Sequence, residues 1–307
     1  MLIPLLLLQL ATQQPILDVH MHALHATDQG PPPQYVCPGS GTLPAPPTNK
    51  PVALNDLMSC AHKLVSGASD DAIMNRTIAI MKKYNVTGVL SGYDMPLTRK
   101  WNRAAPGRFI IGTADEVGLD SARAWIHTGE LKVLGELAFQ YAGIGPGDSI
   151  PEQWYTLAEQ QDVPLAIHVG PGPPGAPYFA APAYRMRLGN PLLLEDALVR
   201  HPKLRIEVMH AGWPMLDQTV GLLYAHPQVY VDLGVISWAI PEKEFYSYLK
   251  RLVDAGFGER IMFGSDQMVW PEALEIAIQR VQRAPFLTAA QKRDIFYDNA
   301  RRWLRLP

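Results

Sequence analysis

Eight short apolar, β-branched runs recur along the chain, and this repetition most constrains its fold. The runs are Ile16–His20, Thr87–Ser91, Phe109–Thr113, Val133–Leu137, Leu165–Val169, Arg205–His210, Val229–Leu233 and Arg260–Gly264. Longer stretches with helical spacing of apolar residues separate most of them, namely Asp71–Tyr84, Pro151–Gln161, Pro191–His201, Met215–Ala225, Pro241–Ala255 and Pro271–Arg283. Strands that alternate with helices in this way form βαβ units and a parallel sheet. Eight such units predict an α/β protein, a single (β/α)8 TIM barrel over residues 15–307.

Two long segments interrupt this alternation. Residues 23–70 follow the first strand and hold eight prolines between Pro31 and Pro51, so we predict a long Pro-rich insertion after strand 1. Residues 170–190 follow the fifth strand. Loops of this length are usually functional, and loops that follow barrel strands lie at the C-terminal face, where barrel active sites occur. The helical pattern is weakest after the second and third strands.

The charge balance excludes several classes of protein. Lys and Arg number 27 against 29 Asp and Glu, which gives a net charge of −2, and only 18% of residues are charged. A general nucleic-acid-binding protein needs an excess of basic residues, and disordered chains and coiled coils need more charge. Two cysteines are too few for a cysteine-rich zinc module. We therefore expect a globular protein that acts on a small molecule and binds no nucleic acid.

The first 14 residues contain the apolar stretch Leu2–Leu10, which resembles the core of a secretory signal. The stretch is short, no Lys or Arg precedes it, and it is too short to span a membrane. Two interpretations stay open: a signal that sends the protein to the periplasm or out of the cell, or an N-terminal arm of a cytoplasmic protein. In an exported protein, Cys37 and Cys60 could form a disulfide.

The ends of the predicted strands carry residues that bind metals. The first strand ends in His20-Met21-His22, and residues two apart on a strand point to the same side. The other candidates at strand ends are Glu136, His168, His210 and Asp266. Each follows an apolar run, where an unpaired imidazole or carboxylate would be costly to bury. The pattern predicts a metal centre at the mouth of the barrel.

These motifs make the chain resemble the amidohydrolase superfamily, and within it the amidohydrolase-related (amidohydrolase 2-like) group. The resemblance covers nearly the whole chain and rests on LDVHMHA, KVLGELAF, LAIHVG, EVMHAGWP, IMFGSDQMVWP and DNARRWL. It implies that His20, His22 and Asp266 hold one divalent metal. It also implies that His168 and His210 hold a second one, with Glu136 between the two. One-metal members commonly lack this bridging acid; in them the strand-five histidine joins the metal and the strand-six histidine acts in catalysis.

The function implied by the resemblance is a metal-dependent hydrolase that cleaves an amide, ester or lactone by attack of a metal-bridging hydroxide. Asp266 would be the general base and acid, with His210 as a second catalytic residue. The metals, one or two per chain, would be Zn2+, or Mn2+, Fe2+ or Ni2+, because imidazole and carboxylate ligands suit all four. Two alternatives stay open: a mononuclear decarboxylase of the same superfamily, and an exported metal- or solute-binding protein without turnover.

Five residues near the predicted mouth are candidates for substrate binding: Tyr141, Arg185, Trp213, Trp238 and Met268. A rim of this kind suits an apolar or aromatic acyl compound. The aromatic residues could equally fill the shell between barrel and helices. Arg185 could bind a substrate carboxylate in a bidentate manner or simply lie in solvent. A homo-oligomer also stays open.

Overall fold

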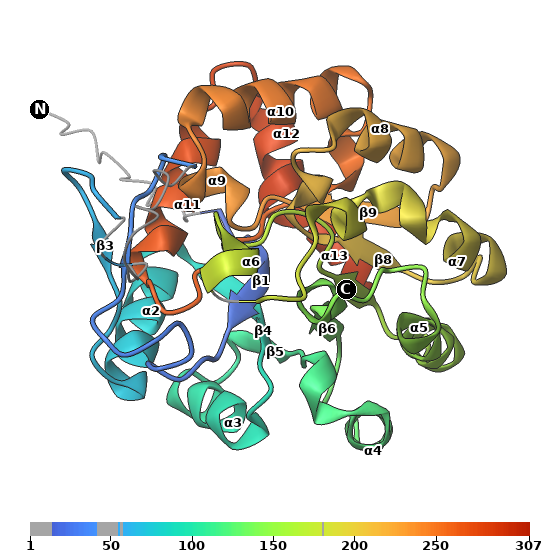
Figure 1. Ribbon diagram of the computed structural model, residues 1–307, viewed down its shortest axis with the longest axis horizontal. Helices are drawn as coiled ribbons and strands as arrows, with labels where there is room; N and C mark the ends of the chain where they lie inside the picture. Colours follow the sequence, from blue (N-terminus) through green and yellow to red (C-terminus); the bar gives the residue numbers. More distant parts are fainter. Residues whose placement is uncertain (1–13, 42–54, 56–57, 180) are drawn as a thin grey trace, which may run out of the picture.

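The computed structural model describes residues 14–41, 55, 58–179 and 181–307, and within them eight strands form a barrel ringed by helices (Figure 1). The barrel strands are β1 (Ile16–His22), β4 (Val86–Ser91), β5 (Phe109–Ile111), β6 (Leu134–Leu137), β7 (Leu165–Ile167), β8 (Ile206–Val208), β9 (Val229–Asp232) and β10 (Ile261–Met262). All eight predicted strands are confirmed, most of them shorter than the apolar runs. The fold is the predicted α/β TIM-barrel-like one.

Backbone hydrogen bonds close the ring of strands. Two parallel sheets, β1-β4-β5 and β10-β9-β8-β7-β6, make up most of it. The amide of Lys132 donates to the carbonyl of Ile111 at 2.9 Å, which joins β5 to β6. The amide of Asp266 donates to the carbonyl of His20 at 2.7 Å, which joins the segment after β10 to β1. The first and last strands of the chain are therefore neighbours.

The helices cover the outside of the barrel. The longer ones are α2 (Asp70–Tyr84), α3 (Met95–Ala104), α4 (Leu119–His127), α5 (Ser149–Gln161), α7 (Glu195–Arg200), α8 (Leu216–Ala225), α10 (Glu242–Asp254) and α11 (Glu272–Arg283). The shorter ones are η1 (Asp115–Val117), η2 (Phe139–Ala142), α6 (Ala176–Phe179), η3 (Met186–Gly189), η4 (Pro191–Leu194), η5 (Met209–Gly212), α9 (Ile236–Ala239), η6 (Gly258–Arg260), α12 (Ala289–Arg293), η7 (Asp294–Asp298) and α13 (Asn299–Leu304).

The six predicted helices are confirmed, with the stretch Pro191–His201 divided into η4 and α7. Helices α3 and α4, after the second and third strands, were not among the predicted ones. Helix α4 has only nine residues, a short window for periodicity, and its apolar residues Leu119, Trp125 and Ile126 are only partly buried against the core. Helix α3 begins at the N-cap Asp94, and one of the four residues that it buries is the polar Thr98, which weakens the apolar pattern.

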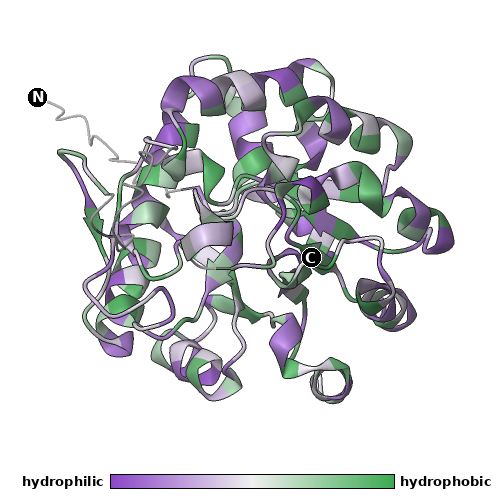
Figure 2. Ribbon diagram, viewed as in Figure 1, coloured by the Kyte–Doolittle hydropathy of each residue, from purple (hydrophilic) through white to green (hydrophobic). Residues whose placement is uncertain are grey.

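Strand residues alternate between two apolar clusters. Ile206 and Val208 belong to a large cluster that the surrounding helices share. Val89, Ala166 and Met262, with residues of other strands, form a second cluster that includes Trp303 of α13. Because successive strand residues point to opposite faces, the second cluster fills the interior of the barrel. Figure 2 shows that hydrophilic residues lie mainly on the outer helix faces.

The segment between β1 and α2 contains a small antiparallel sheet of β2 (Tyr35–Val36) and β3 (Leu64–Val65). The structure pairs Cys37 with Cys60 in a disulfide there. The indole of Trp270, after β10, donates to the carbonyl of Gln34 at 3.2 Å and so ties this segment to the barrel. Part of the predicted Pro-rich insertion lies outside the described residues, and the insertion stays a prediction.

The predicted signal-like stretch Leu2–Leu10 also lies outside the described residues. Among the helices that the structure describes, none is both long and apolar enough to cross a membrane.

Candidate metal centre

The six predicted ligands meet at one end of the barrel. His20 and His22 come from β1 and Glu136 from β6. The other three residues lie one, two and four residues after the ends of β7, β8 and β10; they are His168, His210 and Asp266. The four histidines and Asp266 are buried, and the side chain of Glu136 is only 13% exposed. The parallel strands explain this convergence, because their carboxyl ends all lie at the same rim.

One group of atoms gathers around one carboxylate oxygen of Glu136. Nε2 of His22 lies 3.1 Å from Oε2 of Glu136 and 3.2 Å from Oδ1 of Asp266. Nε2 of His20 lies 3.4 Å from the same Glu136 oxygen and 3.8 Å from Oδ1 of Asp266. Ligand atoms of His20, His22 and Asp266 are close enough together to hold one metal ion.

A second group surrounds the other oxygen of Glu136. Nδ1 of His168 lies 2.7 Å from Oε1, and Nε2 of His210 lies 3.6 Å from it. The two imidazole nitrogens are 3.0 Å apart. Glu136 therefore stands between two histidine pairs and presents a different oxygen to each.

Asp232, at the end of β9, was not among the predicted site residues. Its Oδ2 accepts from Nδ1 of His20 at 2.6 Å, so the lone pair of His20 lies on Nε2, facing the other ligands. Its Oδ1 accepts from the amides of His210 (2.7 Å) and Gly234 (2.9 Å). Gly264 makes room for this pair, since a Cβ there would lie 2.7 Å from Oδ2 of Asp232. The available signal was a carboxylate at the end of the run Val229–Leu233.

Two further side chains hold β1 against the segment after β10. Oδ1 of Asp18 accepts from the amides of His20 and Ser265, both at 3.0 Å. The side-chain amide of Gln267 donates to the carbonyl of His22 at 2.7 Å and accepts from its amide at 3.1 Å. These contacts fix where the first two histidines lie relative to Asp266.

The backbone is strained at several of these positions. His210 (φ 58°), Ala211 (φ 49°) and Asp266 (φ 49°) adopt the left-handed conformation that non-glycine residues rarely occupy. So do Val235 (φ 53°), although it is β-branched, and Met268 (φ 45°). Such strain clusters at functional sites, where the surrounding structure enforces an unusual side-chain direction.

The charges in this cluster favour a bound cation. Burial lowers the pKa of His22, but hydrogen bonds from its imidazole to the carboxylates of Asp266 and Glu136 outweigh this effect and raise the pKa to about 9. The pKa of His20 is likewise raised well above its usual value, against the effect of burial, by the carboxylates of Asp232, Asp266 and Glu136. The carboxylates therefore stabilise positive charge between them. Imidazole and carboxylate donors around such a place fit a divalent metal.

Of the predicted substrate residues, Tyr141 lies against a candidate ligand. Its ring is 4.9 Å from that of His168 and 5.5 Å from that of Tyr184. Burial raises the pKa of the Tyr141 hydroxyl well above its usual value, and the charges of Glu136 and Asp266 add to the effect. The hydroxyl therefore stays protonated.

For the other four residues, the structure shows contacts within the protein. Trp238 is buried, and its indole donates to the carbonyl of Ser265 at 2.8 Å, which supports the loop that carries Asp266. The Trp213 indole donates to Glu244 at 3.2 Å. Arg185 is exposed and donates to backbone carbonyls of its own loop. Met268 is half-buried and packs against the apolar core. Their contact with a substrate stays a prediction.

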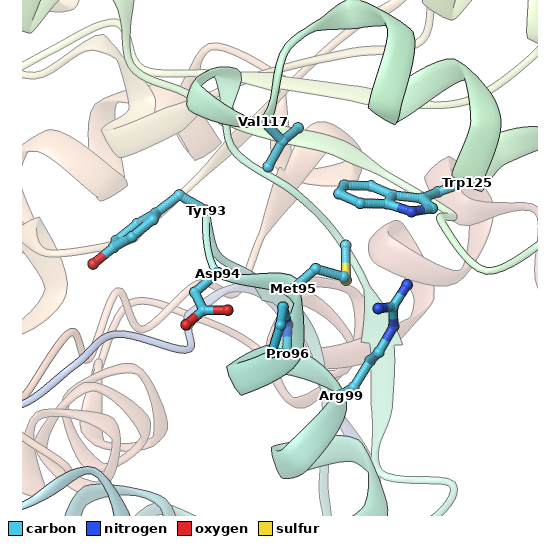
Figure 3. Close-up of a pocket in the computed structure, with 7 residues that line it drawn as sticks. All are labelled: Tyr93, Asp94, Met95, Pro96, Arg99, Val117 and Trp125. Atoms are coloured by element: carbon cyan, nitrogen blue, oxygen red, sulfur yellow. The ribbon is translucent and has the colours of Figure 1, made fainter.

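A separate cavity of about 370 Å³ lies beside the loop between β4 and α3. Figure 3 shows Tyr93, Met95 and Trp125 around it, with the guanidinium of Arg99 near the indole. None of the six candidate ligands lines this cavity. At its edge, Asp94 accepts from Nε2 of His25 at 3.0 Å.

The chain belongs to the amidohydrolase family, because the model of that family (Amidohydro_2) matches residues 17–306. This membership and the ligand cluster place it among the metal-dependent enzymes of the family. No functionally curated protein shows significant sequence similarity to it.

Solved structures share the fold at low sequence identity. An uncharacterised TIM-barrel protein from Bordetella bronchiseptica has 14% identity and a TM-score of 0.60, over 79% of this chain and 86% of that one. A probable 2-pyrone-4,6-dicarboxylic acid hydrolase from Acinetobacter baumannii has 12% identity and a TM-score of 0.59, over 95% and 99%. A dihydroxybenzoic acid decarboxylase from a Polaromonas species, with bound manganese, has 12% identity and a TM-score of 0.52, over 81% and 87%.

Proposed function

We propose that this protein is a hydrolase that uses two divalent metals to cleave an amide, ester or lactone. The observation that carries the proposal is the position of Glu136, whose Oε2 faces His20 and His22 while its Oε1 faces His168 and His210. A carboxylate with its two oxygens directed at two ligand pairs suits a bridge between two metals.

The residues divide into two ligand sets. His20, His22 and Asp266 would hold one metal, and His168 and His210 the other, with Glu136 shared. When bound, a pair of divalent metals polarises a carbonyl group and makes water more acidic. Zn2+ suits this donor set, as do Mn2+, Fe2+ and Ni2+.

In this proposal, a side chain of the protein transfers the proton of the attacking water. Asp266, a member of the first ligand set, would accept the proton of the attacking water and pass it to the leaving group. His210 lies across from it in the second set, held by its Nδ1 hydrogen bond to the carbonyl of Gly234 at 3.0 Å. The ring of Tyr141 lies against that of His168, and an aromatic ring beside the site supports a small substrate with an apolar or aromatic acyl group.

A mononuclear decarboxylase is the second candidate function. The fold shared with the manganese-bound decarboxylase favours it. In that function His20, His22, His168 and Asp266 would hold one metal, and His210 would act on the substrate. The contacts of Glu136 with both histidine pairs support the two-metal function instead, because a site with one metal needs no carboxylate shared between two ligand pairs.

Elemental analysis combined with two activity panels separates these functions. Protein purified under chelator-free conditions is saturated with Zn2+ or Mn2+, desalted and counted for metal. It is then assayed on neutral esters, lactones and anilides, and separately on hydroxybenzoic acids for carbon dioxide release. We expect two metals per chain and hydrolysis. One metal with carbon dioxide release would establish the alternative, and bound metal with neither activity would leave a binding protein.

We also propose that the protein is exported to the periplasm or beyond the cell. The disulfide between Cys37 and Cys60 supports this, because such bonds persist in oxidising compartments and are rare in the cytoplasm. Fractionation of cells that express the full chain tests it: recovery in the cytoplasm with free thiols would contradict export.

A further inference from the structure

Glu207 lies inside the barrel and has no part in the function proposed above. It occupies the middle of β8, opposite Ala166 of β7 and Tyr230 of β9. Its neighbours Ile206 and Val208 pack in the cluster shared with the helices. Because strand residues alternate, the side chain of Glu207 points to the barrel interior, and the residue is completely buried.

The carboxyl group of Glu207 is buried without a hydrogen bond to it in the described structure. Neither of its oxygens makes a hydrogen bond within the described structure, and the same holds for Oδ2 of Asp18. Burial raises the pKa of Glu207 well above its usual value, and the nearby negative charge of Asp232 raises it further. An ionised carboxylate would be very unfavourable here, so Glu207 carries a proton and is a hydrogen-bond donor.

Asp232 is the acceptor that this donor faces. Tyr230 of β9 lies opposite Glu207, and Asp232 follows Tyr230 by two residues. Asp232 therefore lies on the same inner face of the barrel as Tyr230, nearer to the mouth. Asp232 connects the two ligand sets, because it binds the imidazole of His20 and the backbone amide of His210.

We propose that Glu207 is a positioning residue of the metal centre, whose carboxyl group donates a hydrogen bond to Asp232, directly or through a buried water, and holds it against His20. The inference rests on the proposed metal centre. Groups that orient a metal-ligating histidine through its second nitrogen commonly change metal affinity by about 10- to 100-fold when they are removed. Glu207 would act one residue further from the metal, through Asp232.

Three variants test this role by metal affinity and not by activity. Glu207→Leu replaces the hydrogen-bond donor by an apolar side chain of similar size, and Glu207→Gln keeps a donor. Thr77→Val is the matched control. It removes a buried hydroxyl of α2, away from the strand ends, that makes no hydrogen bond with the residues that the structure describes. Affinity for Zn2+ is measured by competition with a chromophoric chelator, and the thermal stability of each metal-free protein is measured alongside.

We expect Glu207→Leu to weaken Zn2+ binding by about tenfold while its metal-free form stays as stable as the wild type. Glu207→Gln and Thr77→Val should bind within about threefold of the wild type. Unchanged affinity in Glu207→Leu, or an equal loss in Glu207→Gln, would overturn the inference. If leucine prevents folding, Glu207→Met supplies the same comparison. A wild type that binds no metal would instead refute the proposed function.

Discussion

Oδ2 of Asp232 accepts from Nδ1 of His20 over 2.6 Å, while its other oxygen is held by two backbone amides. This arrangement leaves no freedom in how the carboxylate lies. It also determines which nitrogen of His20 is available to a metal, because the proton must stay on Nδ1.

Asp232→Asn is therefore expected to weaken metal binding although the side chain keeps its shape. The amide oxygen has to occupy the position held by the two backbone donors, so the NH2 group faces His20 and forces its proton onto Nε2. We expect a loss of about 10- to 100-fold in Zn2+ affinity, measured by chelator competition. Asp148→Asn, in the loop before α5, is the control and should leave the affinity unchanged.

Glu136→Gln tests the bridge. A neutral amide offers one oxygen in place of two, so it cannot serve both histidine pairs. The expected result is a fall from two metals to one per chain, counted by elemental analysis after saturation and desalting. A variant that still holds two metals would show that Glu136 does not bridge.

Asp266→Asn separates proton transfer from metal binding. The amide keeps an oxygen near His22, so the metal content should stay close to that of the wild type. Turnover should fall by about 10²- to 10⁴-fold, because the amide cannot accept a proton. The measurement is kcat on the best ester or lactone, with a metal count on the same sample. Turnover near the wild-type value would exclude Asp266 as the base.

The sequence predicted the barrel and the cluster of candidate ligands for a shared physical reason. Each barrel strand is an apolar run, and each candidate ligand is a polar residue near the end of one, so both are visible in the same pattern. Asp232 ends the run of β9 in the same way, but an acid there could also have paired with a basic residue on the surface. Its role depends on the neighbouring strands, which sequence periodicity does not reveal.

Glu207 and Trp238 show where sequence reasoning fails. Glu207 lies within the apolar run of β8, and a barrel strand is buried on both faces, so no alternation marks the inward side. Trp238 is close in sequence to strand β9, yet its indole turns inward to bind the carbonyl of Ser265. The backbone at Val235, three residues earlier, has a positive φ of 53°, and sequence periodicity does not reveal such a change of chain direction.

The disulfide between Cys37 and Cys60 should contribute measurably to stability. It closes a loop with a sequence separation of 23 residues, and a loop of that length corresponds to about 3 kcal/mol. We expect the Cys37→Ser/Cys60→Ser variant to lose roughly this amount in free energy of unfolding, measured with urea. A reducing agent should destabilise the wild type and not the variant; an unaffected wild type would contradict the expectation.

Glu152 should make stability sensitive to acid. It pairs with Arg200 in a bidentate manner and with His201 at 2.9 Å, and these contacts lower its pKa from 4.5 to about 2. Because the folded protein binds this proton less readily than the unfolded chain, the stabilisation is present above pH 4.5 and is lost as the pH falls towards 2. The free energies of unfolding of the wild type and Glu152→Gln should differ by less than about 1 kcal/mol at neutral pH, and this difference should disappear in acid. A difference that is independent of pH would contradict this.

The junction between the first and last strands of the barrel affects how the protein unfolds. His20 and His22 lie on one side of this junction and Asp266 on the other, and the backbone amide of Asp266 donates to the carbonyl of His20 across it. A metal bound by all three residues would link the first strand of the barrel to the segment after the last strand. Unfolding that starts at this junction would have to release the ion first. Chelation would therefore shorten the lifetime of the folded state as well as stop turnover.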